Sequence, residues 1–99
     1  MDVAAVGFDW DAGNRDKCRK HGLSTAEIEA FILSDPRIAP DLRHSAHEER
    51  FMAVGRNSRG RPIFVVFTVR LQDGKRLIWP LSARYMHKKE IEGYEAESS

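Results

Sequence analysis

Residues 62–83, PIFVVFTVRLQDGKRLIWPLSA, decide how this chain folds. Two runs rich in β-branched and aromatic residues, 62–71 and 75–83, predict two strands. Between them, Gln72-Asp73-Gly74-Lys75 carries the Asp-Gly pair that tight primed turns favour. The stretch therefore predicts an antiparallel hairpin.

Further strands are predicted ahead of this hairpin, because the alternating pattern extends back along the chain. Residues 49–56 form one of them, and Asn57-Ser58-Arg59-Gly60-Arg61 is a good hairpin turn that leads into residue 62. A shorter strand is predicted near residues 37–41. Together these segments predict an antiparallel meander.

Two helices are predicted before the meander, each with its own start and stop signals. Asp11 is a good N-cap for a helix that ends at His21, and Gly22 supplies the left-handed residue that follows. Ser24 begins the second helix with a Ser-x-x-Glu capping box, and Asp35-Pro36 ends it.

The two ends of the chain complete the predicted fold. Residues 4–10 alternate loosely and predict a short edge strand. A last helix is predicted over about residues 86–96, and Met86, Ile91 and Tyr94 are its candidates for docking on the sheet. The predicted order is β-α-α-β-β-β-β-α, an α+β fold with two N-terminal helices, one C-terminal helix and an antiparallel sheet.

The period-two alternation of the last two strands sorts their side chains onto two faces. In the strand 62–71, Ile63 belongs to an apolar face and Arg70 to the opposite face. We expect the apolar face to carry a second set from the next strand: Leu77, Trp79, Leu81 and Ala83. The face of Arg70 is expected to carry the other set, as an anion-binding cleft would: Arg76, Ile78, Pro80, Ser82 and Arg84. Pro80 indicates an edge position or a bulge, and a bulge would shift this alternation.

Charge is distributed unevenly along the chain, although the formal net charge is only +1. Residues 56–89 carry nine basic side chains and one acidic side chain, a net charge of +8, whereas residues 90–99 carry four glutamates. A basic segment of this kind is typical of a surface that binds a polyanion. The plainer interpretation is a solvated sheet face that carries arginines for solubility.

Length and composition exclude several classes of protein. At 99 residues the chain can build one small core, so we expect a single domain over residues 1–99. The one cysteine, Cys18, cannot form an internal disulfide, and no apolar run in the sequence is long enough to span a membrane. The N-terminus lacks the basic leader of a secretion signal, so we expect a cytoplasmic location.

Several short motifs follow one another between about residue 8 and residue 95. They are Phe8-Asp9-Trp10-Asp11, Asn14, Lys20-His21-Gly22-Leu23-Ser24, Asp41-x-x-His44-Ser45-x-x-Glu48-Glu49-Arg50-Phe51, Val54-Gly55, Gly60-Arg61, and Ser82-Ala83-Arg84 with Glu90 and Tyr94. In this order they resemble the BrnT family of bacterial toxins. Trp79-Pro80-Leu81 departs from the pattern, because an Ile-Ile-like pair is expected there.

The resemblance implies a compact ribonuclease with a fold related to the RelE and ParE toxins. It also implies that the toxin cleaves RNA, inhibits translation and is neutralised by a small BrnA-like antitoxin. The toxin and its antitoxin together would bind the operator DNA of their own operon. We expect a higher-order complex with at least two copies of each chain.

RNA cleavage without a metal uses the 2′-hydroxyl of the substrate as the nucleophile. The protein must then supply a base and a group that stabilises the extra charge on phosphorus, which a guanidinium does well. Arg70 and Arg84 are the predicted catalytic arginines, because a paired hairpin would make them neighbours on one face. The alternative is that one of them only pairs with Glu49 or Glu90 to hold the last helix.

Three residues are candidates for the general base. His21 and His44 qualify because an imidazole titrates near neutral pH. His21 follows a helix C-terminus, where the dipole favours the charged form, so it suits an acid or a phosphate contact better, and it serves equally well as a cap. Glu49 is the third candidate, and a surface salt bridge is its plainer role.

The remaining candidates are predicted to bind the substrate. They are Arg56, Arg61, Arg76, Ser82 and Tyr94, although core packing explains Tyr94 better. His44 and His47 have a His-x-x-His spacing, which is a weak metal signal in a loop without cysteine. We therefore expect no metal and no other cofactor.

Two other functions remain open from the sequence. The basic segment of residues 56–89 also fits a non-catalytic module that binds nucleic acid or an acidic antitoxin segment. A domesticated toxin whose surface serves only protein assembly is the third possibility, because fold alone does not fix function.

Overall fold

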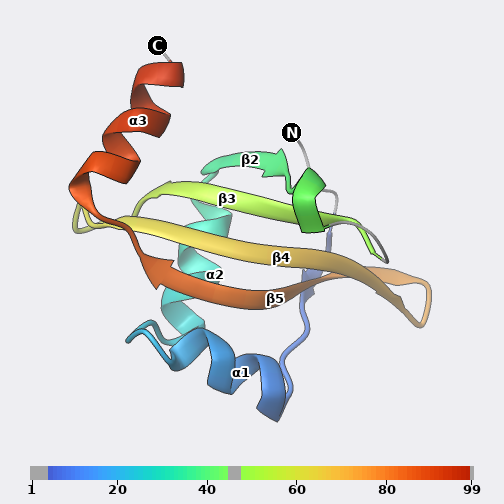
Figure 1. The fold of residues 1–99 in the computed structure, drawn as a ribbon. Helices are drawn as coiled ribbons and strands as arrows, with labels where there is room; N and C mark the ends of the chain where they lie inside the picture. Colours follow the sequence, from blue (N-terminus) through green and yellow to red (C-terminus); the bar gives the residue numbers. More distant parts are fainter. Residues whose placement is uncertain (1–4, 45–47, 99) are drawn as a thin grey trace.

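The computed structural model of the chain describes residues 5–44 and 48–98, in which a five-stranded mixed sheet carries three α-helices (Figure 1). The strands are hydrogen-bonded in the order β1-β5-β4-β3-β2. Along the chain the elements are β1 (Gly7–Phe8), α1 (Ala12–Arg19), α2 (Thr25–Leu33), β2 (Arg37–Pro40), the 3-10 helix η1 (Leu42–His44), β3 (Arg50–Arg56), β4 (Pro62–Gln72), β5 (Lys75–Tyr85) and α3 (Lys88–Ser98).

The hairpin between β4 and β5 forms as its turn residues predict. Gln72 pairs with Lys75, and the two residues between them, Asp73 and Gly74, both have positive φ, at 52° and 76°. These values are typical of the primed turns that match strand twist. The antiparallel meander of β2, β3, β4 and β5 is thus confirmed.

The predicted antiparallel sheet is wrong for β1. This strand has two residues and pairs in parallel with β5, with Gly7 opposite Leu77 and Phe8 opposite Ile78. The backbone N–H of Asp9 also donates to the carbonyl of Ile78, at 2.8 Å. The sheet is therefore mixed, because its other strand pairs are antiparallel. The sequence of a two-residue strand is too short to indicate the direction of the strand beside it.

The predicted caps of the first two helices are confirmed. Asp11 accepts from the backbone N–H of Asn14 at 2.8 Å, and the Asn14 side chain accepts from the backbone N–H of Asp11 at 2.7 Å. Ser24 and its capping-box partner exchange the same two bonds at the start of α2. Helix α1 ends at Arg19, two residues before the predicted end, and a turn carries the chain to Gly22, whose φ is 90°.

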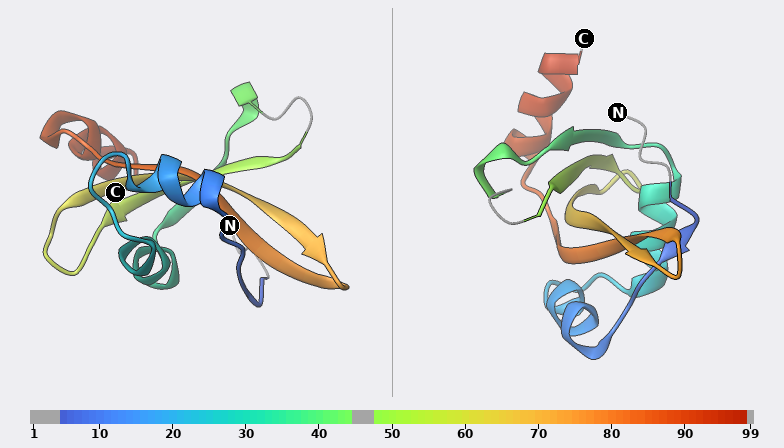
Figure 2. Two further views of the ribbon diagram at one scale, coloured as in Figure 1. Left: turned by 90° about the horizontal axis from the view of Figure 1, so that it is seen from below. Right: turned by 90° about the vertical axis from the view of Figure 1, so that its right-hand side faces the viewer.

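The sheet has two faces that differ in what covers them. Face A, which carries Val65 and Phe67 of β4, packs against α1 and α2 around the main hydrophobic core. Face B carries the alternate residues of the same strands, and α3 packs on it, so that the sheet lies between α1 and α3 (Figure 2). Phe51 and Phe67 stack within the main core, with ring centroids 5.4 Å apart.

Helix α3 docks on one end of face B through a second, smaller apolar cluster. Its members are the buried Val54, Met86 and Ile91, with Phe64 and Tyr94 packed beside them. The predicted docking of Met86, Ile91 and Tyr94 is therefore confirmed, although the helix begins at Lys88, two residues after its predicted start, and Met86 lies just before it. The rest of face B, toward the hairpin of β4 and β5, lies away from α3 (Figure 1).

A β-bulge in β5 decides which of its side chains reach face B. Val66 pairs with Ser82 and Phe67 pairs with Pro80, so that Leu81 is an extra residue between them. The alternation of β5 therefore differs before and after Leu81.

The predicted faces of β5 are accordingly right beyond the bulge and wrong before it. Ser82 and Arg84 lie on the face of Arg70, as predicted. Trp79 and Leu77 also lie there, contrary to prediction, because the turn pairs Leu77 with Arg70. The residues that exchange places with them, and so lie on face A, are Arg76, Ile78 and Pro80.

Candidate functional site

Face B presents its side chains in rows that run across the strands. Residues paired across neighbouring strands share a face, and successive rows lie about 7 Å apart, two residues along a strand. From the α3 end to the hairpin end the rows are Arg84, Phe64 and Val54; Ser82, Val66 and Met52; Trp79, Thr68 and Arg50; Leu77 and Arg70.

The two predicted catalytic arginines share this face, but they are not neighbours. Arg84 pairs with Phe64, whereas Arg70 lies six residues further along the same strand. At roughly 3.3 Å per residue their backbones are about 20 Å apart. The expectation that they grip a single phosphodiester is therefore wrong, because strand pairing in a hairpin puts the end of one strand beside the start of the next.

At the α3 end, Arg84 is held by a glutamate of the helix. Its two terminal nitrogens donate to the two carboxylate oxygens of Glu90 at 3.1 and 3.0 Å, and Glu90 also accepts from the backbone N–H of His87. These bonds lower the pKa of Glu90 to about 2, and the same contact raises the pKa of Arg84. The pair is bidentate and closed.

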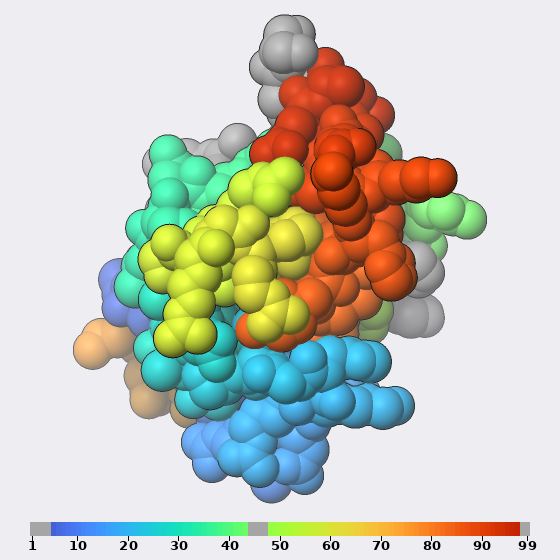
Figure 3. Space-filling model, turned by 90° about the vertical axis from the view of Figure 1, so that its left-hand side faces the viewer, coloured from blue at the N-terminus to red at the C-terminus, as the bar shows by residue number. Residues whose placement is uncertain are grey.

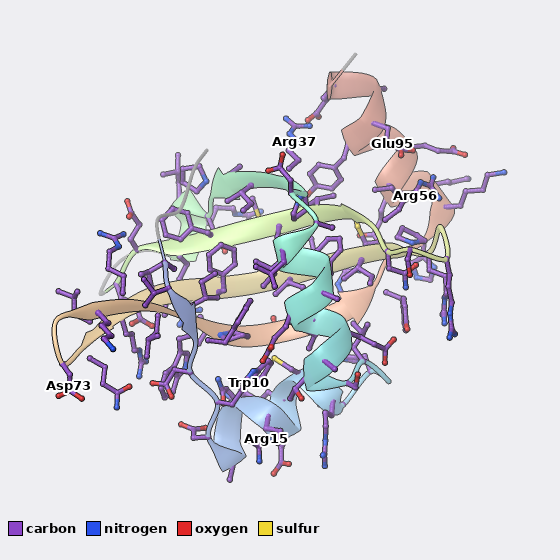
Figure 4. The ribbon with its side chains drawn as sticks, turned by 180° about the vertical axis from the view of Figure 1, so that it is seen from behind. Trp10, Arg15, Arg37, Arg56, Asp73 and Glu95 are labelled. Carbon is purple, nitrogen blue, oxygen red and sulfur yellow. The ribbon has the colours of Figure 1, made fainter. Side chains whose placement is uncertain are left out.

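Two further arginines tie α3 to the sheet. Arg56 of β3 donates two hydrogen bonds to Glu95, both at 3.0 Å, which lower the pKa of this carboxylate. Arg37 of β2 donates to the carbonyl of Tyr94 at 3.0 Å and lies 3.7 Å from Glu97. Figure 4 shows Arg37, Arg56 and Glu95 gathered beside α3, at the opposite end of the sheet from Asp73.

At the hairpin end of face B, Arg70 is held more loosely. Its terminal nitrogen lies 3.7 Å from the carboxylate of Glu48, which is longer than a hydrogen bond. Its guanidinium carbon lies 3.8 Å from the ring centroid of Trp79. The Arg70 and Glu48 side chains are 44% and 36% exposed, so both are accessible to a ligand.

Thr68 fixes the segment that brings Glu48 to this place. Its side chain is buried, and its hydroxyl donates to the carbonyl of Glu49 at 2.7 Å. The strand β3 begins one residue later, at Arg50, which pairs with Thr68. Glu48 is therefore set beside Arg70 by the start of a strand.

Of the predicted bases, none is placed beside Arg70 by an observed contact. Glu49 is exposed and lies just before β3, and no described contact joins its side chain to Arg70. His21 follows α1, which packs on face A, so the sheet separates it from Arg70. The side chain of His44, and His47, lie outside the described residues. Their roles stay predictions.

Glu48 and Trp79 were missed as site candidates by reasoning from the sequence. Glu48 belongs to a motif with two adjacent glutamates, Glu48 and Glu49, and only the structure shows that Glu48 is the one beside Arg70. Trp79 was assigned to the apolar face because the prediction did not place Leu77 opposite Arg70.

The predicted substrate-binding residues are dispersed. Ser82 is exposed on face B, and Tyr94 packs in the cluster under α3. Arg61 stacks on Tyr85, 3.5 Å from the ring centroid, and Tyr85 belongs to face A. Arg76 pairs with Leu71 on face A, so its predicted place beside Arg70 is wrong.

A hollow of about 430 Å³ lies between α2 and the turn that joins β3 and β4. Figure 3 views the molecule from this end, with the turn (yellow) between α3 (red) and the first two helices (cyan and blue). The hollow is lined by both Glu27 and Arg59, so its charge is mixed. Cys18 is a buried residue of α1, and burial raises the pKa of its thiol to about 11, which disfavours the thiolate that a nucleophile needs.

The fold and the site thus define an α+β protein that carries several arginines on one face of its sheet, most of them paired with glutamates. A family model described as "Ribonuclease toxin, BrnT, of type II toxin-antitoxin system" matches residues 10–90. The chain therefore belongs to this family of ribonuclease toxins, which confirms the resemblance read from its motifs. No curated protein matches the chain.

Two broader findings accompany the family. A toxin of a type II system has an antitoxin as its partner. In the described part of the chain, no helix combines the length and the apolar character needed to cross a membrane.

Proposed function

We propose that this chain is a metal-independent endoribonuclease whose reaction centre lies at the hairpin end of face B. The observation that carries the proposal is the loose pair of Arg70 and Glu48, both exposed and 3.7 Å apart. An arginine that is not fully occupied by its carboxylate can turn to a phosphate. A neighbouring carboxylate can then accept a proton.

The reaction is an internal transesterification of RNA. The 2′-oxygen bonds to phosphorus while its proton passes to the Glu48 carboxylate, and the bond from phosphorus to the 5′-oxygen breaks. The leaving 5′-oxygen takes a proton from water, so the products carry a 2′,3′-cyclic phosphate and a 5′-hydroxyl. Arg70 stabilises the charge that develops on the phosphoryl oxygens, which is the largest contribution expected of the protein.

Arg84 has a different role in this proposal. Both terminal nitrogens of its guanidinium donate to Glu90, so it anchors α3 and thereby sets the edge of the RNA-binding surface. Arg56 and Arg37 act with it, since each pairs with a later glutamate of the same helix. This agrees with the alternative role of Arg84, a pair with Glu90 that holds the last helix.

The biological setting follows from the family. We propose that cleavage inhibits translation in the cytoplasm and that a BrnA-like antitoxin neutralises the chain. We also propose that the two chains form a higher-order complex that binds their operator DNA, and that the fold is related to RelE and ParE. An acidic antitoxin segment would suit a face that carries Arg50 and Arg70.

The test uses the two adjacent glutamates as a matched pair. Purified Glu48→Gln and Glu49→Gln variants are compared with the wild type on single-stranded RNA in EDTA. We expect Glu48→Gln to lower the cleavage rate by about 10²–10⁴-fold, because it removes the general base. Glu49→Gln should cleave nearly as the wild type does.

Three results would contradict the proposal. Equal loss in both glutamate variants would remove the assigned base, and cleavage that needs an added divalent metal would remove the mechanism. Salt-sensitive RNA binding by the wild type without any cleavage would favour the non-catalytic binding module instead. Unfolding curves of all variants verify that the fold is kept.

A further inference from the structure

Trp79 stands on the part of face B that lies toward the hairpin, away from α3. It is partly exposed, and across the neighbouring strands its row continues with Thr68 and Arg50. Arg70 covers the ring, with its guanidinium carbon 3.8 Å from the ring centroid. A large flat ring among polar and cationic neighbours is thus presented on the open side of a sheet.

We propose that Trp79 and Arg70 form a subsite for one nucleobase of single-stranded RNA. This inference rests on the proposed function, since it assigns base binding to the same face that carries the reaction centre. Every base has an aromatic face, and both an indole ring and a guanidinium plane stack on it. The ligand class is therefore any unpaired nucleotide, without strong preference among the four bases.

The position of Arg70 couples the base to the phosphate. Its guanidinium contacts Trp79 and lies 3.7 Å from the carboxylate of Glu48, a distance too long for a hydrogen bond. When Arg70 turns toward a phosphate, it uncovers the ring face that it occupied. The base of the bound nucleotide takes that place, so that one arginine links recognition of the base to contact with the backbone.

Charge favours RNA over an apolar protein segment as the occupant. The guanidinium of Arg70 lies over the ring and Glu48 lies beyond it, 3.7 Å from Arg70, so the charged group in contact with the ring is a cation. A phosphate backbone supplies negative charge at every nucleotide, and its bases supply the flat surfaces.

The binding experiment uses a probe that the enzyme cannot cleave. A 2′-O-methyl oligoribonucleotide has no free 2′-hydroxyl, and an abasic oligonucleotide of the same length keeps the phosphates without the bases. The chain has two tryptophans, so a Trp10→Phe variant leaves Trp79 as the sole reporter. We expect the base-bearing probe to quench its fluorescence and to bind about tenfold more tightly than the abasic probe.

Substitution of Trp79 supplies the second measurement. We expect Trp79→Leu to weaken the base-bearing probe by about five- to a hundredfold and to leave the abasic probe unchanged, and Trp79→Phe to retain most of the binding. Tyr85→Leu is the matched control, because Tyr85 also lies under an arginine, Arg61, but on face A. That variant should bind both probes as the wild type does.

Three outcomes would overturn the inference: equal affinity for the two probes, no quenching of Trp79, or unchanged binding in Trp79→Leu. Loss of antitoxin binding in Trp79→Leu, with RNA binding intact, would also overturn it and assign the surface to the antitoxin. The proposed function is judged separately, by the cleavage rates of Glu48→Gln and Glu49→Gln. Cleavage without a preference for the base-bearing probe would contradict only the subsite. Binding of the base without cleavage would contradict only the proposed function.

Discussion

The two ends of face B use the same pair of residue types in different ways. At the α3 end, Arg84 and Glu90 form two hydrogen bonds of about 3 Å, and Arg56 and Glu95 do the same. At the hairpin end, Arg70 and Glu48 are 3.7 Å apart and Arg70 rests on an aromatic ring. The types of the paired residues are therefore a poorer guide to function than the number of hydrogen bonds between them.

The difference has a cause in the sequence. Four glutamates lie in residues 90–99, so the helix that ends the chain brings carboxylates to whichever arginines it reaches. It reaches Arg37, Arg56 and Arg84, which come from three different strands. Arg70 is about 20 Å further along the sheet, beyond the helix. An acidic helix thus selects which part of a basic face stays available to a polyanion.

The largest expected effect is a difference in RNA cleavage between variants of Arg70 and of Arg84. Arg70→Met should lower the rate of RNA cleavage by about 10²–10³-fold and leave the unfolding transition almost unchanged, because it removes a phosphate contact from an exposed site. Arg84→Met should do the reverse, with cleavage close to that of the wild type and lower stability, because Glu90 loses its partner. Cleavage rates and thermal unfolding of the two variants check this, and identical behaviour would erase the distinction between the two ends.

A smaller effect is expected from the support of Glu48. Thr68→Val keeps the shape of a buried side chain but removes its hydrogen bond to the carbonyl of Glu49. The free energy of unfolding should fall by about 1 kcal/mol, with some loss of cleavage. Ser82→Ala is the control, because Ser82 is exposed on the same face and should change neither quantity. A stable, fully active Thr68→Val would argue against this support.

The smallest predicted effect is the loss of stability of α3 at low pH. A pKa lowered by folding means that Glu90 contributes its full stabilisation above its ordinary value of 4.5 and loses it as the pH falls toward about 2; the lowered pKa of Glu95 acts in the same direction. Protection of α3 amides against hydrogen exchange should therefore fall in this range before that of β4 amides. Equal protection of both elements across the range would contradict the role of these ion pairs.

Local signals predicted most of the fold. Asp73-Gly74 fixed a turn through positive φ angles that few other residue pairs tolerate, and Asp11 and Ser24 marked helix starts through bonds to residues three positions away. Such features depend on a few neighbouring residues, so they can be read directly. The parallel pairing of β1 joins residues about seventy positions apart, and nothing local encodes it.

The candidate site was predicted less well, for a physical reason. Arg70 and Arg84 share a face, as predicted, only because of the bulge at Leu81, since Leu77 lies opposite Arg70 and an odd number of residues separates Leu77 from Arg84. Placing them side by side needs the register, which the turn sets at Leu77 opposite Arg70. The choice of Glu48 over Glu49 depends on where β3 begins, and strand ends are less sharply encoded than strand centres.

The extra residue Leu81 changes which face of the sheet the later residues of β5 occupy. Between Trp79 and Arg84 the chain advances five residues, an odd number, yet both side chains emerge on the same surface. If Leu81 instead paired regularly with Val66, Ser82 through Tyr85 would turn over, the guanidinium of Arg84 would lie on the buried face of the sheet, and α3 would lose its anchor. Deletion of Leu81 should therefore leave Arg84 on face B, because regular alternation over four residues gives the same face as five residues with a bulge.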